Sequence, residues 1–74
     1  MGNGLLWTTE DAARLSSLRV EKGLDVFQVA RLMNLSTHQV GELESLEVEI
    51  DRSYFYTPAI KAQIGHRLLS KLKL

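Results

Sequence analysis

The sequence predicts an all-α protein, a compact bundle of four or five helices formed by a single domain over residues 1–74. Two observations carry this prediction. The run from Gly23 to Glu44 holds two short amphipathic segments, each preceded by a residue type that caps helices. Near the carboxyl end, apolar residues recur every four positions, the spacing that places side chains on one face of a helix: Ile60, Ile64, Leu68 and Leu72.

The first predicted helix follows Thr8. The Thr8 hydroxyl can cap the helix, and Asp11, three residues later, can complete a capping box. The helix is expected to run to about Lys22, because Gly23 is suited to the left-handed conformation that ends a helix. Three of its apolar residues are expected to turn inward: Ala12, Leu15 and Leu18.

Two shorter helices are predicted next, joined by a tight turn in a helix-turn-helix over residues 25–45. Asp25 can cap the first, residues 26–33, and Ser36 the second, residues 37–45. Gln28 and Gln39 lie where they can close a capping box at each start. Leu35 lies in the turn, where it can fill the angle between the helices. The inner faces are expected to consist of Val29, Ala30, Leu32, Met33, Val40 and Leu43.

The segment of residues 46–56 is predicted to be a loop or a short helix. Apolar and acidic residues alternate in it as in a strand, but the chain offers no second strand for pairing. The aromatic residues 54–56 are expected to be half-buried under the last helix, residues 58–72, which begins with Thr57 as cap and Pro58 as first residue. Gly65 inside that helix costs about 1 kcal/mol relative to alanine, so we expect a close contact there. Trp7 is expected to fold back on the core.

The charges of the chain do not predict a uniformly basic surface. Nine basic and nine acidic residues leave a net charge of zero, whereas DNA-binding domains usually carry a basic excess. The two signs are segregated along the chain. Residues 41–51 contain acidic residues and no basic one, namely Glu42, Glu44, Glu47, Glu49 and Asp51. Residues 52–74 contain basic residues and no acidic one, namely Arg52, Lys61, Arg67, Lys71 and Lys73.

Several classes of function are not expected. Without cysteine there is no disulfide and no thiolate metal site, and His38 and His66 have no ligand-like partners nearby. No apolar run approaches the roughly 20 residues of a membrane span, so a cytoplasmic location is expected. The spacings of a nucleophile elbow or a phosphate loop do not occur. We therefore expect no enzymatic activity, no cofactor, no metal and no small-molecule substrate.

The second helix of the pair is expected to present a polar outer face. With Val40 and Leu43 turned inward, Gln39 lies at the edge, and the residues that face outward are Thr37, His38, Gly41 and Glu42. Hydroxyl, imidazole and amide groups both donate and accept hydrogen bonds, and a carboxylate accepts from a cytosine amino group. Such a face suits contact with base edges.

The caps, turn and inner residues of this pair resemble the helix-turn-helix of the Xre/Cro/phage-repressor family, which has a lambda-repressor-like fold. The resemblance implies a transcriptional regulator that binds double-stranded DNA with helix 37–45 in the major groove, as a homodimer or as the amino-terminal module of a longer chain. It implies base contacts from Thr37, His38, Gln39, Gly41 and Glu42. The phosphate contacts would come from Arg19, Lys22, Arg31 and Ser36.

The pattern of residues 18–44 also resembles the cytoplasmic helix-turn-helix domain of RodZ-type cell-shape proteins, and this resemblance covers roughly residues 14–72. That group carries an apolar residue after the cap of the first helix of the pair, as Val26 does here, and binds a protein, the actin-like filament former MreB, instead of DNA. This resemblance implies a protein interface at Val26 and Phe27, with no DNA role. A third interpretation is that Phe27 packs within the monomer, against Trp7 or residues 54–56.

Overall fold

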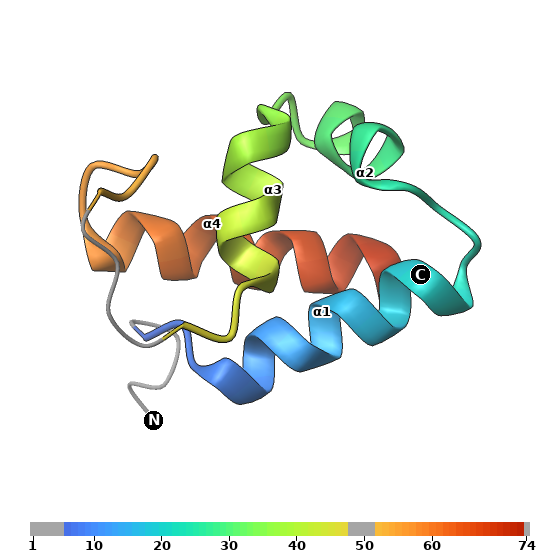
Figure 1. The fold of residues 1–74 in the computed structure, drawn as a ribbon, viewed down its shortest axis with the longest axis horizontal. Helices are drawn as coiled ribbons and strands as arrows, with labels where there is room; N and C mark the ends of the chain where they lie inside the picture. Colours follow the sequence, from blue (N-terminus) through green and yellow to red (C-terminus); the bar gives the residue numbers. More distant parts are fainter. Residues whose placement is uncertain (1–5, 48–51, 74) are drawn as a thin grey trace.

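The computed structural model describes residues 6–47 and 52–73, and these residues form four α-helices and no strand. The helices are α1 (Thr9–Glu21), α2 (Val26–Leu32), α3 (Thr37–Glu44) and α4 (Pro58–Lys73). α1 packs against both α3 and α4, and α2 packs against α3 (Figure 1). The predicted all-α bundle is confirmed, and the predicted helix limits differ from the observed ones by a single residue at their carboxyl ends.

The starts of α1, α2 and α3 are stabilised by capping boxes, as predicted. The side chains of Thr8, Asp25 and Ser36 each accept a hydrogen bond from the backbone N–H three residues later. The side chains of Asp11, Gln28 and Gln39 return a bond to the cap's own backbone N–H. At α4, the hydroxyl of Thr57 accepts from the backbone N–H of Ile60 at 3.1 Å. Each bond satisfies a donor that the helix itself leaves without a partner.

The carboxyl ends of α1 and α2 close in the same way. Gly23 follows α1 with φ of 71°, and Asn34 follows α2 with φ of 58°. In both cases the backbone N–H of the next residue returns to a carbonyl in the last turn, Leu24 to Arg19 at 3.0 Å and Leu35 to Ala30 at 2.8 Å. This is the Schellman arrangement, which favours glycine or asparagine at the left-handed position. The turn into α3 therefore has a local cause in Asn34.

The core lies where α1, α3 and α4 meet and extends under α2. It consists of Leu15, Val29, Ala30, Val40, Leu43, Phe55, Leu68, Leu69 and Leu72. The turn residue Leu35 and the α4 residue Ile64 pack against its edge. The amphipathic stripe of α4 is thus used mainly inside the monomer, and Ile60 at its amino end is the member that remains exposed.

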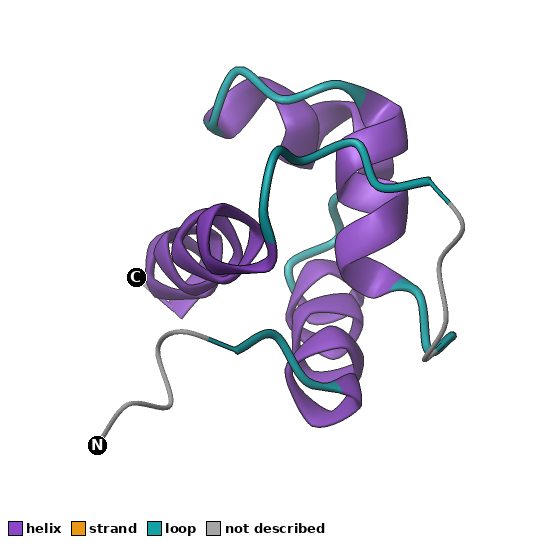
Figure 2. Ribbon diagram, turned by 90° about the vertical axis from the view of Figure 1, so that its left-hand side faces the viewer, coloured by secondary structure: helices purple, strands orange, loops and turns teal. Residues whose placement is uncertain are grey.

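The segment before α4 crosses over α3 on its way into the last helix (Figure 2). Its described residues, 46–47 and 52–57, form no helix, and residues 48–51 lie outside the described part. The prediction of three half-buried aromatic residues is wrong: Phe55 is 7% exposed, whereas Tyr54 is exposed and Tyr56 is 94% exposed. Of the three, Phe55 alone joins the core.

Trp7 packs against the middle of α4. Its ring Nε1 donates a hydrogen bond to the backbone carbonyl of Leu43 at 2.8 Å, and the ring meets His66 edge-on with centroids 5.3 Å apart. A Cβ added to Gly65 would lie within 3.0 Å of three ring carbons of Trp7. The close contact predicted at Gly65 is confirmed, and the Trp7 ring is the group that leaves no room for a side chain at this position.

Candidate functional site

The outer face of α3 borders an open groove of about 330 Å³. Thr37, His38 and Gly41 line it along the first two turns of the helix, as predicted, and Ser45 lies at its end. The opposite wall comes from the segment before α4, with Arg52 and Tyr54. No Cβ contact would restrict Gly41, because nothing lies within 4 Å of the position a Cβ would take. The groove can therefore be approached closely along α3.

His38 and Tyr54 form the aromatic part of this groove. Their rings are stacked, with centroids 5.2 Å apart and planes 19° from parallel. Gln39, expected at the edge of the face, donates from its side-chain amide to the backbone carbonyl of Tyr54 at 3.1 Å, while its carbonyl oxygen serves the capping box. Both the amide nitrogen and the carbonyl oxygen of the Gln39 side chain are therefore engaged within the molecule, whereas His38 is exposed.

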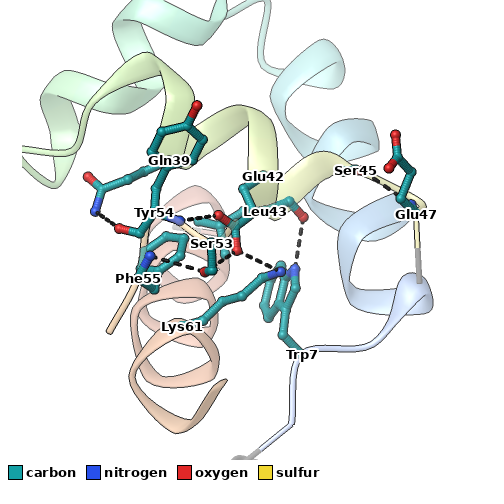
Figure 3. A network of polar contacts seen from close by, with 10 residues as sticks. All are labelled: Trp7, Gln39, Glu42, Leu43, Ser45, Glu47, Ser53, Tyr54, Phe55 and Lys61. Atoms are coloured by element: carbon teal, nitrogen blue, oxygen red, sulfur yellow. Dashed lines mark hydrogen bonds and ion pairs between the residues drawn. The ribbon is translucent and has the colours of Figure 1, made fainter. Parts of the chain in front are cut away.

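Glu42 was expected to face outward as a base contact, and this prediction is wrong. The residue is 8% exposed, and its carboxylate is surrounded by donors (Figure 3). The backbone N–H of Tyr54 donates to Oε1 at 2.6 Å, the hydroxyl of Ser53 donates to Oε2 at 2.6 Å, and Lys61 Nζ lies 3.1 Å from Oε2. The segment that crosses α3 covers this side of the helix, which the spacing within α3 could not reveal.

The environment of Glu42 keeps the carboxylate charged. Burial acts to raise its pKa, but hydrogen bonds from Ser53, from the Tyr54 backbone and from Lys61 outweigh burial and hold the pKa below its ordinary value of 4.5. The carboxylate thus ties α3, the crossing segment and α4 together. Its function is to position Tyr54 over α3, and no oxygen is left free for a base.

Arg19 was expected to contact phosphate, but the structure engages its guanidinium within the protein. Its Nε donates to Glu44 Oε2 at 2.7 Å, its Nη2 to Glu44 Oε1 at 3.1 Å and its Nη1 to the backbone carbonyl of Leu24 at 3.0 Å. The hydrogen bond to Glu44 raises the pKa of Arg19 above its ordinary value. This bidentate ion pair joins α1 to the end of α3, and Arg19 does not line the groove.

The other predicted phosphate contacts are scattered. Lys22 and Arg31 are exposed, and Ser36 uses its hydroxyl to cap α3. Sequence reasoning missed Arg52 and Tyr54, which the structure brings to the groove. Arg52 marks the point where the charge of the sequence changes from acidic to basic, and this was the signal that could have indicated it.

A second groove, of about 390 Å³, lies on the outer side of α2 and reaches Thr37 at the start of α3. Phe27, Gln28 and Arg31 line its α2 wall. The side chain of Phe27 is 71% exposed, so the interpretation that it packs within the monomer is wrong. Val26 is half-buried and packs against the core. Phe27 is therefore the most exposed large apolar residue of α2.

Within residues 6–47 and 52–73, no three side chains of the usual metal-binding types gather into one cluster. No helix in that part of the chain has the length and apolar character needed to cross a membrane. Comparisons with protein-family models, with curated proteins and with solved structures found no match. The surface of α2 and α3 is therefore the basis for a proposal about function.

Proposed function

We propose that the protein binds double-stranded DNA, with α3 in the major groove, in the manner of a transcriptional regulator of the Xre/Cro type. The observation that carries the proposal is the open groove along α3, where Thr37 and His38 lie beside Gly41. A hydroxyl and an imidazole can reach base edges, and a glycine about one turn further along α3 lets the helix approach closely. Glu42 has no part in base contact, because its oxygens are bonded within the protein.

Phosphate contacts are assigned to groups on both sides of α3. Arg52 and Tyr54 form the wall of the groove opposite α3, and Arg31 and Gln28 lie on the α2 side. Two arginines are few for a DNA-binding surface, and Asp25 and Glu47 oppose them nearby. The proposal therefore predicts weak binding to non-specific DNA and a shallow dependence on salt, with a slope of about −2 on a log–log plot for two neutralised phosphates.

The test is a titration of the domain with mixed-sequence duplex DNA at low salt, followed by backbone amide NMR. We expect shifts centred on Thr37, His38, Gly41 and Arg52. The Arg52→Gln variant is expected to weaken binding and to lower the salt slope by about 1, because one phosphate contact is lost. The Arg14→Gln variant is the matched control, since Arg14 is exposed on α1 away from both grooves.

The absence of any shift at low salt would overturn the DNA proposal. Equal weakening by Arg52→Gln and Arg14→Gln would do the same, because it would show attraction to net charge without a defined site. A homodimer would place two α3 helices about 34 Å apart, one turn of DNA. A binding site with two half-sites at this spacing, found by selection from random duplexes, is the result expected of a dimer.

A second function is favoured by Phe27 and is of a different class: a protein-interaction module of the RodZ type. A phenylalanine ring that is 71% exposed at the start of α2 is the kind of aromatic anchor that protein interfaces bury. The surrounding groove supplies Gln28 and Arg31 as a polar rim. On this proposal the same face of the helix pair meets a protein surface, and the zero net charge needs no further explanation.

Co-sedimentation with polymerised MreB filaments tests the second function. If it is correct, the wild-type domain pellets with the filaments, and Phe27→Ser weakens binding by about 30-fold, the effect of a 2 kcal/mol anchor. Because Phe27 is exposed, the substitution is expected to change the free energy of unfolding by less than about 0.5 kcal/mol. Tyr56→Ser is the control, since Tyr56 is an exposed aromatic residue outside the α2 groove. Failure of the wild-type domain to pellet rejects this partner.

A further inference from the structure

A separate recess, of about 630 Å³, lies between the carboxyl ends of α2 and α4. Its walls carry three cationic side chains, Arg31 from α2 and Arg67 and Lys71 from α4. Arg67, Ser70 and Lys71 are three and four residues apart, so they share one face of α4. Neither predicted interface involves Arg67 or Lys71.

The recess has a net positive charge even after the helix ends are considered. Arg31 and Lys71 lie in the last turns of α2 and α4, where a cation offsets the negative end of the helix dipole. Each helix end is equivalent to about half a negative charge, so the two together cancel about one of the three positive charges. No acidic side chain lines the recess. None of the three cations is within ion-pair distance of a carboxylate in residues 6–47 and 52–73.

The recess also has an apolar part. Leu32, 46% exposed, and Met33 lie beside the cations, and Asn34 adds a polar side chain at the turn after α2. A purely ionic ligand would leave the leucine and methionine in water. Small-molecule sites commonly combine apolar contact area with a few polar groups that fix the ligand's orientation. The composition therefore matches a ligand with one anionic and one apolar end.

We infer that this recess binds a soluble organic phosphate of the nucleotide class. Arg67 and Lys71 hold the phosphate groups, Arg31 closes the site from α2, and Leu32 and Met33 contact the organic part. Arginine suits this task because its planar donors match pairs of phosphate oxygens, and lysine adds a compact charge. The inference shares Arg31 with the proposed DNA and protein surfaces, but Arg67 and Lys71 of α4, which hold the phosphate groups, belong to neither.

The test is a titration of the domain with ADP, inorganic pyrophosphate and adenosine, each followed by backbone amide NMR. We expect ADP to give saturable shifts at Asn34, Ser70 and Lys71, pyrophosphate to give weaker shifts at the same amides, and adenosine to give none. The double variant Arg67→Gln/Lys71→Gln is expected to weaken ADP binding by at least about tenfold, because two charge-assisted contacts are lost. All the altered side chains are exposed, so the fold is expected to persist, and thermal unfolding checks this.

The matched control is Lys22→Gln/Lys73→Gln, which removes the same charge from exposed positions outside the recess. Equal weakening by both double variants would overturn the inference, because only net charge would then matter. Non-saturable shifts with ADP would also overturn it. Binding to phosphatidic acid vesicles without binding to ADP would assign the recess to a lipid headgroup instead. A loss of DNA binding in Arg67→Gln/Lys71→Gln, with ADP binding unchanged or absent, would assign it to the DNA surface.

Discussion

Gly65→Ala is expected to destabilise the protein by about 2 kcal/mol, although alanine is the better helix former. The helix propensity of alanine would by itself stabilise α4 by about 1 kcal/mol. The added Cβ, however, would lie within 3.0 Å of three carbons of the Trp7 ring, so the ring must move. Displacing the ring would break its hydrogen bond to Leu43 and its packing contacts. The stability lost with them outweighs the gain in helix propensity.

The measurement is urea unfolding of Gly65→Ala beside Gly41→Ala. Gly41 also lies within a helix, but a Cβ there would meet no atom within 4 Å, so this control is expected to be stabilised by up to about 1 kcal/mol. Trp7 is the one tryptophan of the chain, and its fluorescence is expected to shift to longer wavelength in Gly65→Ala. If both variants changed stability in the same direction, the role assigned to Trp7 would be wrong.

A double-mutant comparison separates the steric contact from other effects of Gly65→Ala. When Trp7→Ala has removed the ring, Gly65→Ala is expected to become stabilising by about 1 kcal/mol, as at Gly41. The change of sign measures the coupling between the two residues. Persistent destabilisation in the Trp7→Ala background would point to a cause within α4 itself.

Glu42→Gln is expected to lower the free energy of unfolding by about 2–3 kcal/mol. Glutamine has the shape of glutamate but places an amide NH₂ beside Lys61 or Ser53, and Lys61 loses its ionic partner at 3.1 Å. A buried donor or charge left without its partner costs more than an ordinary hydrogen bond contributes. Glu47→Gln is the control, since Glu47 is exposed and makes no ion pair within the described residues. Comparable losses in both variants would contradict the positioning role of Glu42.

The contribution of Glu42 to stability has a defined pH dependence. Its pKa in the folded protein lies below the ordinary value of 4.5, so the folded state binds the proton less readily than the unfolded state. The stabilisation is therefore fully present above about pH 5 and is lost as the pH falls through the lowered pKa. The stability difference between wild type and Glu42→Gln is expected to stay constant from pH 8 to about 5 and to shrink below 4.5. A difference that grew on acidification would contradict this assignment.

The helices and their ends were predictable from sequence because their causes are local. Thr8, Asp25 and Ser36 each cap a helix with a partner three residues later. At the end of α1, the left-handed Gly23 lets the next backbone N–H, that of Leu24, bond back to the last turn. Asn34 closes α2 by the same local rule, although its side chain gave a weaker signal than glycine. Apolar spacing likewise placed Leu43 and Leu68 in the core, since the period of a helix decides which residues share a face.

The candidate site was predictable only in part. Thr37, His38 and Gly41 lie on the open side of α3 because Val40 and Leu43 occupy the other side. Nothing within α3 indicated that its flank would be covered. From the sequence, Glu42 and Arg19 were interpreted as solvent-exposed charges, because charged residues are seldom buried.

Sequence alone was sufficient for the all-α class, the helix limits to within a residue and most of the inward faces, because neighbours within about four residues decide those features. Leu32 is the exception, because it was predicted to face inward and is 46% exposed. The packed chain was needed to assign the charges. Glu42 meets donors from residues 11 and 12 positions away, and Arg19 meets a carboxylate 25 positions away. Such pairs depend on how the helices cross, which local patterns do not specify. Only the tertiary structure therefore shows which charged side chains remain free on the surface to contact a partner.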